Sequence, residues 1–293
     1  MKVAKKIDSF ALIVGAMKCG TTSLYNYLIQ HPEIAACRYK EPHFFGKRSN
    51  LEKGFEYYQN LWDWNKKNYR IALEASTSYT GFKSIPIEGN VNSAKAIARF
   101  QADYELNFKF IYLMRNPIER LESHYNHLKA NQYRHRKITR SKLNMMIESS
   151  KYAMQIDEYV SIFPRKNILL LNFDKLKQEP AKLIKEVCEF LEVDSQYNFQ
   201  GLQVNHNSHK NRQEVIIPGW QSIRKNELVS SVIISIPKEV KHLMRNLLSR
   251  QQKAKYIKFS LEEKEYIVKQ LKSDLLKLKY DHEFNFSSWN IEL

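Results

Sequence analysis

The stretch FALIVGAMKCGTTSLYNYL, residues 10–28, decides the fold. Its apolar run FALIV is short, ends at Gly15 and is typical of a buried parallel strand. The residues that follow predict a helix that is capped by Thr21 or Thr22 and runs to about His31. A strand, a glycine-containing loop and a helix in this order predict an anion-binding site, because the N-terminus of a helix favours negative charge.

The loop contains a lysine at an unusual place. In a nucleoside-triphosphate loop the lysine follows the last glycine and directly precedes Ser or Thr, whereas Lys18 comes two residues before Gly20. Gly15 permits a sharp turn, and Gly20 permits close approach to a ligand. A strand–turn–helix junction with a solvated lysine is the alternative interpretation. The predicted anion ligands are Gly15, Lys18, Cys19, Gly20, Thr21, Thr22 and Ser23.

Composition and charge restrict the class of protein. The chain has 293 residues, 43% of them hydrophobic, which suits one large α/β domain with a substantial core. The formal net charge of +16 predicts anionic partners, which include nucleic acids, acidic glycans, anionic lipids and nucleotides. Three cysteines without zinc-ligand spacing predict neither a disulfide framework nor a metal site. We therefore expect a soluble, cytoplasmic protein, whose N-terminal apolar run is too short to cross a bilayer.

Strand-like and helix-like segments alternate along the chain. This order predicts a central parallel sheet flanked by helices, with ligands bound beyond the carboxyl ends of the strands. We expect a single domain over 1–293, with a core at about 8–215 and a helical C-terminal part at about 220–293. The sequence does not indicate an oligomeric state. Further strands are predicted at 69–76, 108–114 and 167–173, and helices at 54–62, 93–105, 151–164, 180–193 and 260–280.

The segment GAMKCGTTSLYNYLIQHP resembles the 5′-phosphosulfate-binding loop of sulfotransferases that use 3′-phosphoadenosine 5′-phosphosulfate (PAPS). Loops of that family have a glycine, two residues, a lysine, one residue, a glycine and a threonine. The resemblance extends over residues 10 to about 215 and implies a P-loop-like α/β fold. It further implies sulfuryl transfer from PAPS to an acceptor, release of adenosine 3′,5′-bisphosphate (PAP), and no requirement for a metal.

A second motif, IYLMRNPIERLESHYNHL, lies at another strand-to-helix junction, where Asn116 can cap the helix. The resemblance implies that Arg115 and Ser123 bind the 3′-phosphate of the donor. An arginine offers a two-pronged set of donors that matches phosphate oxygens. The alternative is that Arg115 pairs with Glu119 or Glu122 and that Ser123 is a surface hydroxyl.

A third, looser similarity concerns the segment VNHNSHKNRQ at 204–213. The resemblance implies that Lys210 and Arg212 close over the donor nucleotide, and a solvated basic loop is the alternative. Two histidine pairs with i, i+3 spacing lack a third metal ligand, so we interpret them as surface or cleft residues. These pairs are His124 with His127 and His206 with His209.

The segment RYKEPHFF at 38–45 is expected on the acceptor side. The resemblance places the general base at Glu41, with Lys40 and His43 beside the acceptor and Glu74 facing the same cleft. The alternatives are that Glu41 only neutralises nearby lysines, or that His43 is the base. Heparan sulfate sulfotransferases carry a lysine where this chain has Ala75, which argues against a glycosaminoglycan acceptor. The acceptor is thus expected to be a carbohydrate, a lipid or a small molecule.

Two other functions compete with sulfuryl transfer. A P-loop kinase would need an acidic magnesium ligand at a strand end, and Asp174 lies one residue beyond the expected place. A nucleic-acid-binding protein is suggested by the net charge and by the basic segment at 133–142. Aromatic residues near that segment are few, so a stacking surface is unsupported and nucleic acid is not an expected partner.

Overall fold

The structure is a computed structural model that describes residues 6–81, 89–131, 138–202, 213–216, 250–253 and 256–293. Five parallel strands form its central sheet, in the spatial order β2-β3-β1-β4-β5. Their bounds are β1 Ser9–Gly15, β2 Ile34–Ala36, β3 Ile71–Glu74, β4 Asn107–Met114 and β5 Ile168–Asn172. The predicted parallel sheet is confirmed, although β2 was not predicted, because three residues are too few to show a pattern.

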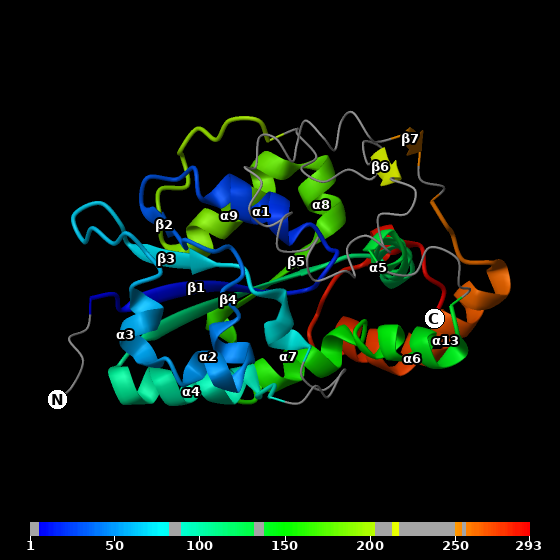
Figure 1. The fold of residues 1–293 in the computed structure, drawn as a ribbon, viewed down its shortest axis with the longest axis horizontal. Helices are drawn as coiled ribbons and strands as arrows, with labels where there is room; N and C mark the ends of the chain where they lie inside the picture. Colours follow the sequence, from blue (N-terminus) through cyan, green and yellow to red (C-terminus); the bar gives the residue numbers. More distant parts are fainter. Residues whose placement is uncertain (1–5, 82–88, 132–137, 203–212, 217–249, 254–255) are drawn as a thin grey trace, which may run out of the picture.

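Helices cover both faces of this sheet (Figure 1). One face carries α1 Thr21–Leu28, α8 Phe173–Gln178 and α9 Pro180–Leu191. The other carries α2 Arg48–Leu51, α3 Gly54–Gln59, α4 Ser93–Tyr104 and α7 Tyr152–Val160. Beyond the carboxyl ends of the strands lie α5 Pro117–Asn131, α6 Arg140–Glu148 and α13 Leu261–Tyr280. Single 3₁₀ turns occur at η1 Phe44–Gly46, η2 Thr77–Thr80, η3 Arg165–Asn167 and η5 Ser287–Trp289.

The core between the sheet and α3 is built from aromatic rings. Phe10 on β1 stacks on Phe108 of β4 at 5.4 Å between ring centroids, and Tyr58 of α3 stacks on Phe44 at 4.4 Å. All four side chains are buried. Stacked rings of this kind bury large apolar areas in fixed geometry. The core therefore holds the starts of β1 and β4 in register, with Phe10 opposite Phe108.

The C-terminal part packs against the same core. Ser260 caps α13 in a capping box with Glu263, and the Asp274 carboxylate accepts the N–H groups of Ala153 and Met154 at the start of α7. Further on, the Trp289 indole donates to the Asn172 side chain at the end of β5. The predicted helix at 260–280 is confirmed, whereas the single-domain organisation stays a prediction.

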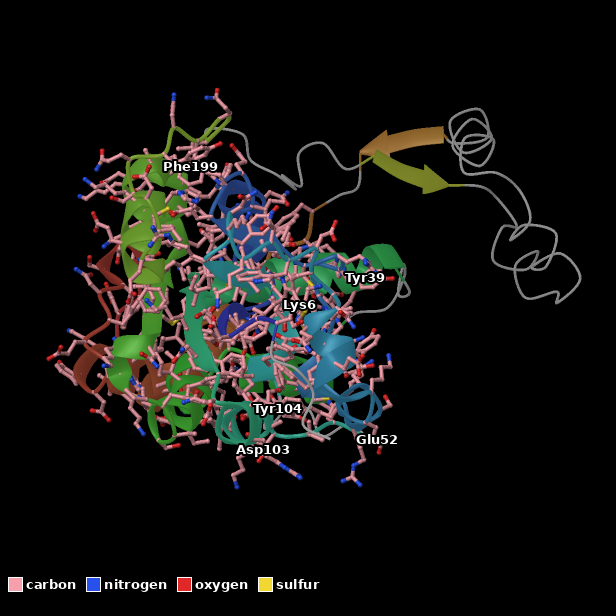
Figure 2. The ribbon with its side chains drawn as sticks, turned by 90° about the vertical axis from the view of Figure 1, so that its left-hand side faces the viewer. Lys6, Tyr39, Glu52, Asp103, Tyr104 and Phe199 are labelled. Carbon is pink, nitrogen blue, oxygen red and sulfur yellow. The ribbon has the colours of Figure 1, made fainter. Side chains whose placement is uncertain are left out.

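A separate antiparallel pair was not predicted. It joins β6 Gln213–Ile216 to β7 Arg250–Lys253, and Figure 2 shows it at a distance from the main sheet. Strands of four residues separated by more than thirty others leave no local hairpin signal in the sequence. None of the described helices combines the length and the apolarity needed to cross a bilayer.

Candidate functional site

The loop after β1 has a tightly constrained backbone. A Cβ atom on Gly15 would lie 2.4 Å from the Tyr112 ring, and one on Gly20 would lie 2.3 Å from the Phe173 ring. Lys18 and Gly20 both have left-handed backbone conformations, with φ of 71° and 91°. Residues in such conformations within a turn form concave surfaces that bind anions. Both positions thus require glycine, as the sequence predicted. The rings that exclude a side chain there belong to Tyr112 of β4 and Phe173 of α8.

Helix α1 begins directly after this loop. Its N-cap is Gly20, and no described side chain caps it, which corrects the expectation that Thr21 or Thr22 is the cap. Both threonines lie inside the first turn, followed by Ser23. The N–H groups of a first helical turn have no acceptor within the helix, so they are suited to bind an anion.

Cys19 contributes only its backbone to this loop. Its side chain is buried, and its sulfur lies 3.8 Å from the Tyr152 hydroxyl. Burial raises the pKa of the Cys19 thiol, so this thiol is not a reactive nucleophile. The Tyr152 hydroxyl in turn donates to the Arg115 carbonyl at 2.8 Å, which ties the loop to the end of β4.

The Arg115 side chain pairs with a residue in the first turn of α5. Its guanidinium donates to the Glu119 carboxylate and lies over the Phe173 ring at 5.1 Å. The alternative pairing with Glu119 is therefore present in the structure. Ser123 is buried, which corrects the alternative of a surface hydroxyl. The expected helix cap is confirmed, because Asn116 accepts the N–H of Ile118 at 2.9 Å.

A second arginine, Arg120, was missed by sequence reasoning. It is 1% exposed and donates to the Met17 carbonyl in the loop and to the hydroxyls of Ser149 and Ser150. No described carboxylate forms an ion pair with it. Within a helix with a basic and acidic surface, such an arginine looks solvent-exposed, so the sequence contains no signal of its burial.

His124 lies one turn beyond Arg120 and is also buried. This finding excludes the surface alternative for His124, and a position beside a cleft stays a prediction. Burial, followed by the positive charges of Arg120 and Lys18, lowers the pKa of His124 to about 3. The imidazole is therefore neutral at physiological pH.

Glu41, which is expected on the acceptor side, is partly exposed and lies between the side chains of Lys40 and His43. The Lys40 ammonium group pairs with one carboxylate oxygen, and His43 Nε2 lies 3.8 Å from the other. Burial lowers the pKa of His43, so this imidazole is predominantly neutral at pH 7. Its Nδ1 lies 2.7 Å from the Ser78 hydroxyl, which orients the ring. Glu41 is thus a carboxyl group within reach of solvent, and such a group can accept a proton from an attacking hydroxyl.

Glu74 is buried and has no surface open to a cleft. Its carboxylate is fully buried and accepts hydrogen bonds from the hydroxyls of Tyr58, Tyr79 and Ser76 at 2.8, 2.8 and 2.5 Å. The Ser76 hydroxyl also accepts the backbone N–H of His43 at 3.0 Å. Burial raises the pKa of Glu74 to about 7. This residue is therefore corrected from a substrate ligand to a support for the backbone that carries Glu41 and His43.

A cavity of about 330 Å³ lies beside the start of α1. Ser23 and Tyr27 of α1, Phe173 and Lys177 of α8, and Leu202 form much of its wall. Tyr27 holds Leu202 in place by donating to its carbonyl at 3.0 Å. The stretch with Lys210 and Arg212, like His206 and His209, lies outside the described residues.

The structure gives no support to a magnesium site at β5. The Asp174 carboxylate accepts from Ser288 at 3.0 Å and pairs with Lys177 at 2.6 Å, so it holds the C-terminal segment in place. Among the described residues, no three His, Cys, Asp or Glu side chains are grouped as metal ligands. The Asp174 carboxylate is therefore explained by its contacts with Ser288 and Lys177, and not by a magnesium ion.

This chain is similar in sequence to known sulfotransferases. The mouse bifunctional heparan sulfate N-deacetylase/N-sulfotransferase 1 is 28% identical over 213 residues, covering 67% of this chain and 23% of the relative. Human heparan sulfate glucosamine 3-O-sulfotransferase 6 is 27% identical over 191 residues, covering 62% of this chain and 51% of the relative. The chain thus spans between about a quarter and a half of the length of these relatives.

A solved sulfotransferase from Alicyclobacillus acidocaldarius superposes with a TM-score of 0.63 at 19% identity, covering 99% of this chain and all of that one. This likeness confirms the predicted P-loop-like α/β fold. The sequence profile of the sulfotransferase domain matches residues 8–267, most of the chain. The chain belongs to the sulfotransferase domain family.

Proposed function

We propose that this protein transfers a sulfuryl group from PAPS to an acceptor hydroxyl or amine. One observation carries the proposal: Lys18 adopts a left-handed conformation in the constrained loop, two residues before the N-cap of α1, and buried Arg120 of α5 donates to the neighbouring Met17 carbonyl. Membership of the sulfotransferase domain family supports the same chemistry. A triphosphate-binding loop would instead set its lysine at the start of the helix.

The described residues fit the donor in charge and in size. The first amides of α1 suit the 5′-phosphate, and Arg115 with Ser123 suits the 3′-phosphate. Buried Arg120 has no acidic partner among the described residues, so a bound anion would compensate its charge. The cavity at Ser23, Tyr27 and Phe173 is large enough for a nucleoside. We extend this assignment to Lys210 and Arg212 as ligands of the nucleotide.

The chain's own groups then perform the transfer. PAPS supplies an activated sulfuryl group that is joined to a phosphate. Glu41 accepts the proton of the attacking hydroxyl, a contribution typically worth about 10²–10⁴-fold in rate. Lys18 holds the negative charge that develops on the oxygen between sulfur and phosphorus. Lys40 and His43 orient the acceptor beside Glu41. We propose that fixed cations suffice for this charge and that no metal is required.

The acceptor is proposed to be a carbohydrate hydroxyl. Both curated relatives carry heparan sulfate in their names, and Lys40 and exposed Arg38 give this side of the site a positive charge. Ala75, where the heparan sulfate branch carries a lysine, favours an acceptor that differs from a glycosaminoglycan. A lipid or a small alcohol is the competing class. We also propose a cytoplasmic location, which fits three unbridged and buried cysteines.

The test is to incubate the protein with PAPS labelled in its sulfuryl group and a panel of saccharides, lipids and small alcohols. Label should move to a saccharide, PAP should accumulate in equal amount, and EDTA should leave the rate unchanged. Transfer to lipids or small alcohols alone would overturn the acceptor class. Magnesium-dependent turnover of ATP, with PAPS left intact, would support a kinase in place of a sulfotransferase.

A further inference from the structure

The imidazole of His124 has an unsatisfied nitrogen. His124 follows Ser123 on α5 and is 7% exposed, and its Nδ1 atom is buried without a hydrogen-bond partner among the described residues. Buried polar side-chain atoms in folded proteins nearly always have a partner. Leaving one unpaired costs free energy, so such an atom in a site points to a ligand that supplies the partner.

The groups around this nitrogen are cationic. Besides burial, four basic side chains oppose protonation of the imidazole, in decreasing order Arg120, Lys18, His127 and Lys142. The low pKa of His124 keeps the ring neutral, so one nitrogen carries a hydrogen and the other does not. A neutral imidazole among cations can still donate a hydrogen bond to an anion.

Arg120 lies on the same face of α5 as His124 and contacts the loop after β1. It lies one helical turn before His124, and its guanidinium donates to the Met17 carbonyl, the residue before Lys18. A buried cation without an acidic partner is costly unless an anion approaches it. The unsatisfied nitrogen and the uncompensated charge therefore lie on one face of α5, next to the middle of the loop.

We propose that His124 donates a hydrogen bond from Nδ1 to the sulfuryl group of the bound donor. This inference rests on the proposed function. There the start of α1 takes the 5′-phosphate, and Arg115 with Ser123 takes the 3′-phosphate. The sulfuryl group is the remaining anionic part, and Lys18, which the proposal places beside it, is also a neighbour of His124.

The experiment compares PAPS with PAP, which lacks only the sulfuryl group, by calorimetry in the absence of acceptor. Three variants are matched: His124→Leu removes both nitrogens, His124→Asn keeps an N–H near Nδ1, and His124→Gln places it near Nε2 instead. Loss of a hydrogen bond to an anion should weaken PAPS binding by about 10-fold or more. We expect this loss in the Leu and Gln variants and a much smaller one in the Asn variant, while all bind PAP as the unmodified protein does.

Equal weakening of PAPS and PAP would overturn the inference, because His124 would then act on the loop or on a phosphate. Unchanged affinities in all variants would overturn it as well. If His124→Leu does not fold, the Asn and Gln pair decides between the two ring nitrogens. Failure of the unmodified protein to bind either nucleotide would instead contradict the proposed function itself, so the two failures are distinguishable.

Discussion

The guanidinium of Arg115 donates two hydrogen bonds, of 2.9 and 2.7 Å, to a single carboxylate oxygen of Glu119 one turn along α5. The Glu119 side chain is 47% exposed, so this pair is weak and replaceable. A phosphate bound by Arg115 has to displace Glu119 from the guanidinium. The pair thus holds the arginine in place and would compete with the 3′-phosphate that we propose as its ligand.

Glu119→Gln should therefore tighten the binding of PAP. Removing the competing carboxylate and its repulsion of the phosphate should lower the dissociation constant by roughly two- to fivefold. Calorimetric titration measures the change. The matched control is Asp103→Asn, which breaks an exposed i, i+4 pair with Arg99 on α4, and Asp103 lies on the surface in Figure 2. Weaker binding in Glu119→Gln alone would mean that Glu119 orients Arg115 productively.

Arg115→Ala should weaken the binding of PAPS much more than that of adenosine 5′-phosphosulfate. Only PAPS has a 3′-phosphate, so its affinity should fall by about 10-fold or more, while that of adenosine 5′-phosphosulfate should hardly change. Competition binding with the two nucleotides provides the measurement. A parallel loss for both would place Arg115 at the 5′ side of the donor.

Lys18→Ala should lower turnover by about 10²–10³-fold, comparable to the loss of an oxyanion donor. The charge of Lys18 is needed mainly as the bond between sulfur and oxygen breaks, so PAP affinity should fall much less. Rates are measured with labelled PAPS and an acceptor from the panel. Lys272→Ala, an exposed lysine on α13, serves as the control. Unchanged turnover in Lys18→Ala would remove this residue from the chemistry.

Glu41→Gln should abolish transfer and preserve the affinity for PAP. The amide cannot accept the proton of the acceptor, yet Glu41 is assigned no contact with the nucleotide. Glu52→Gln is the matched control, because Glu52 is an exposed carboxylate on the surface in Figure 2. A Glu41→Gln variant that transfers normally would favour His43 as the base.

Glu74 should make the stability of the fold depend on pH. Burial raises the pKa of Glu74 from 4.5 to about 7 in the native protein. The native state then holds a proton that the unfolded chain releases, so this contribution is full below pH 4.5 and is lost as pH rises through 7. Between pH 4.5 and 8 the loss amounts to roughly 3 kcal/mol of unfolding free energy.

Glu74→Gln removes this titration. Urea unfolding of both proteins at pH 5 and pH 8 gives the difference, which isolates Glu74 from the other titrating groups. The amide oxygen can still accept from Tyr58 and Tyr79, while the amide nitrogen can donate to Ser76. If the two proteins lose stability in parallel between these pH values, Glu74 is ionised in the native state throughout.

Local patterns predicted the loop and the second motif because both depend on neighbours in the sequence. Gly15, Gly20 and Asn116 each perform a backbone role that only a few residue types fill. The left-handed conformation of Lys18 was not predictable, since non-glycine residues adopt it rarely.

Burial of charged side chains was the part that sequence could not predict. Glu74 can be buried because the hydroxyls of Tyr58 on α3 and Tyr79 on η2 donate to its carboxylate. Arg120 can be buried because the hydroxyls of Ser149 and Ser150, just after α6, accept its hydrogen bonds. Such partners are distant in the chain. A strand-end glutamate and a helical arginine otherwise look like cleft and surface residues.

The central claim is that the loop and α5 bind an adenosine with anionic groups at both its 3′ and 5′ positions. Titrating the protein with PAP in a calorimeter, with ADP as the control that lacks the 3′-phosphate, tests it most directly. The account predicts heat and one-to-one binding for PAP, at least about 10-fold tighter than ADP, with no need for magnesium. Absence of binding by PAP, or tighter magnesium-dependent binding of ADP, would contradict it.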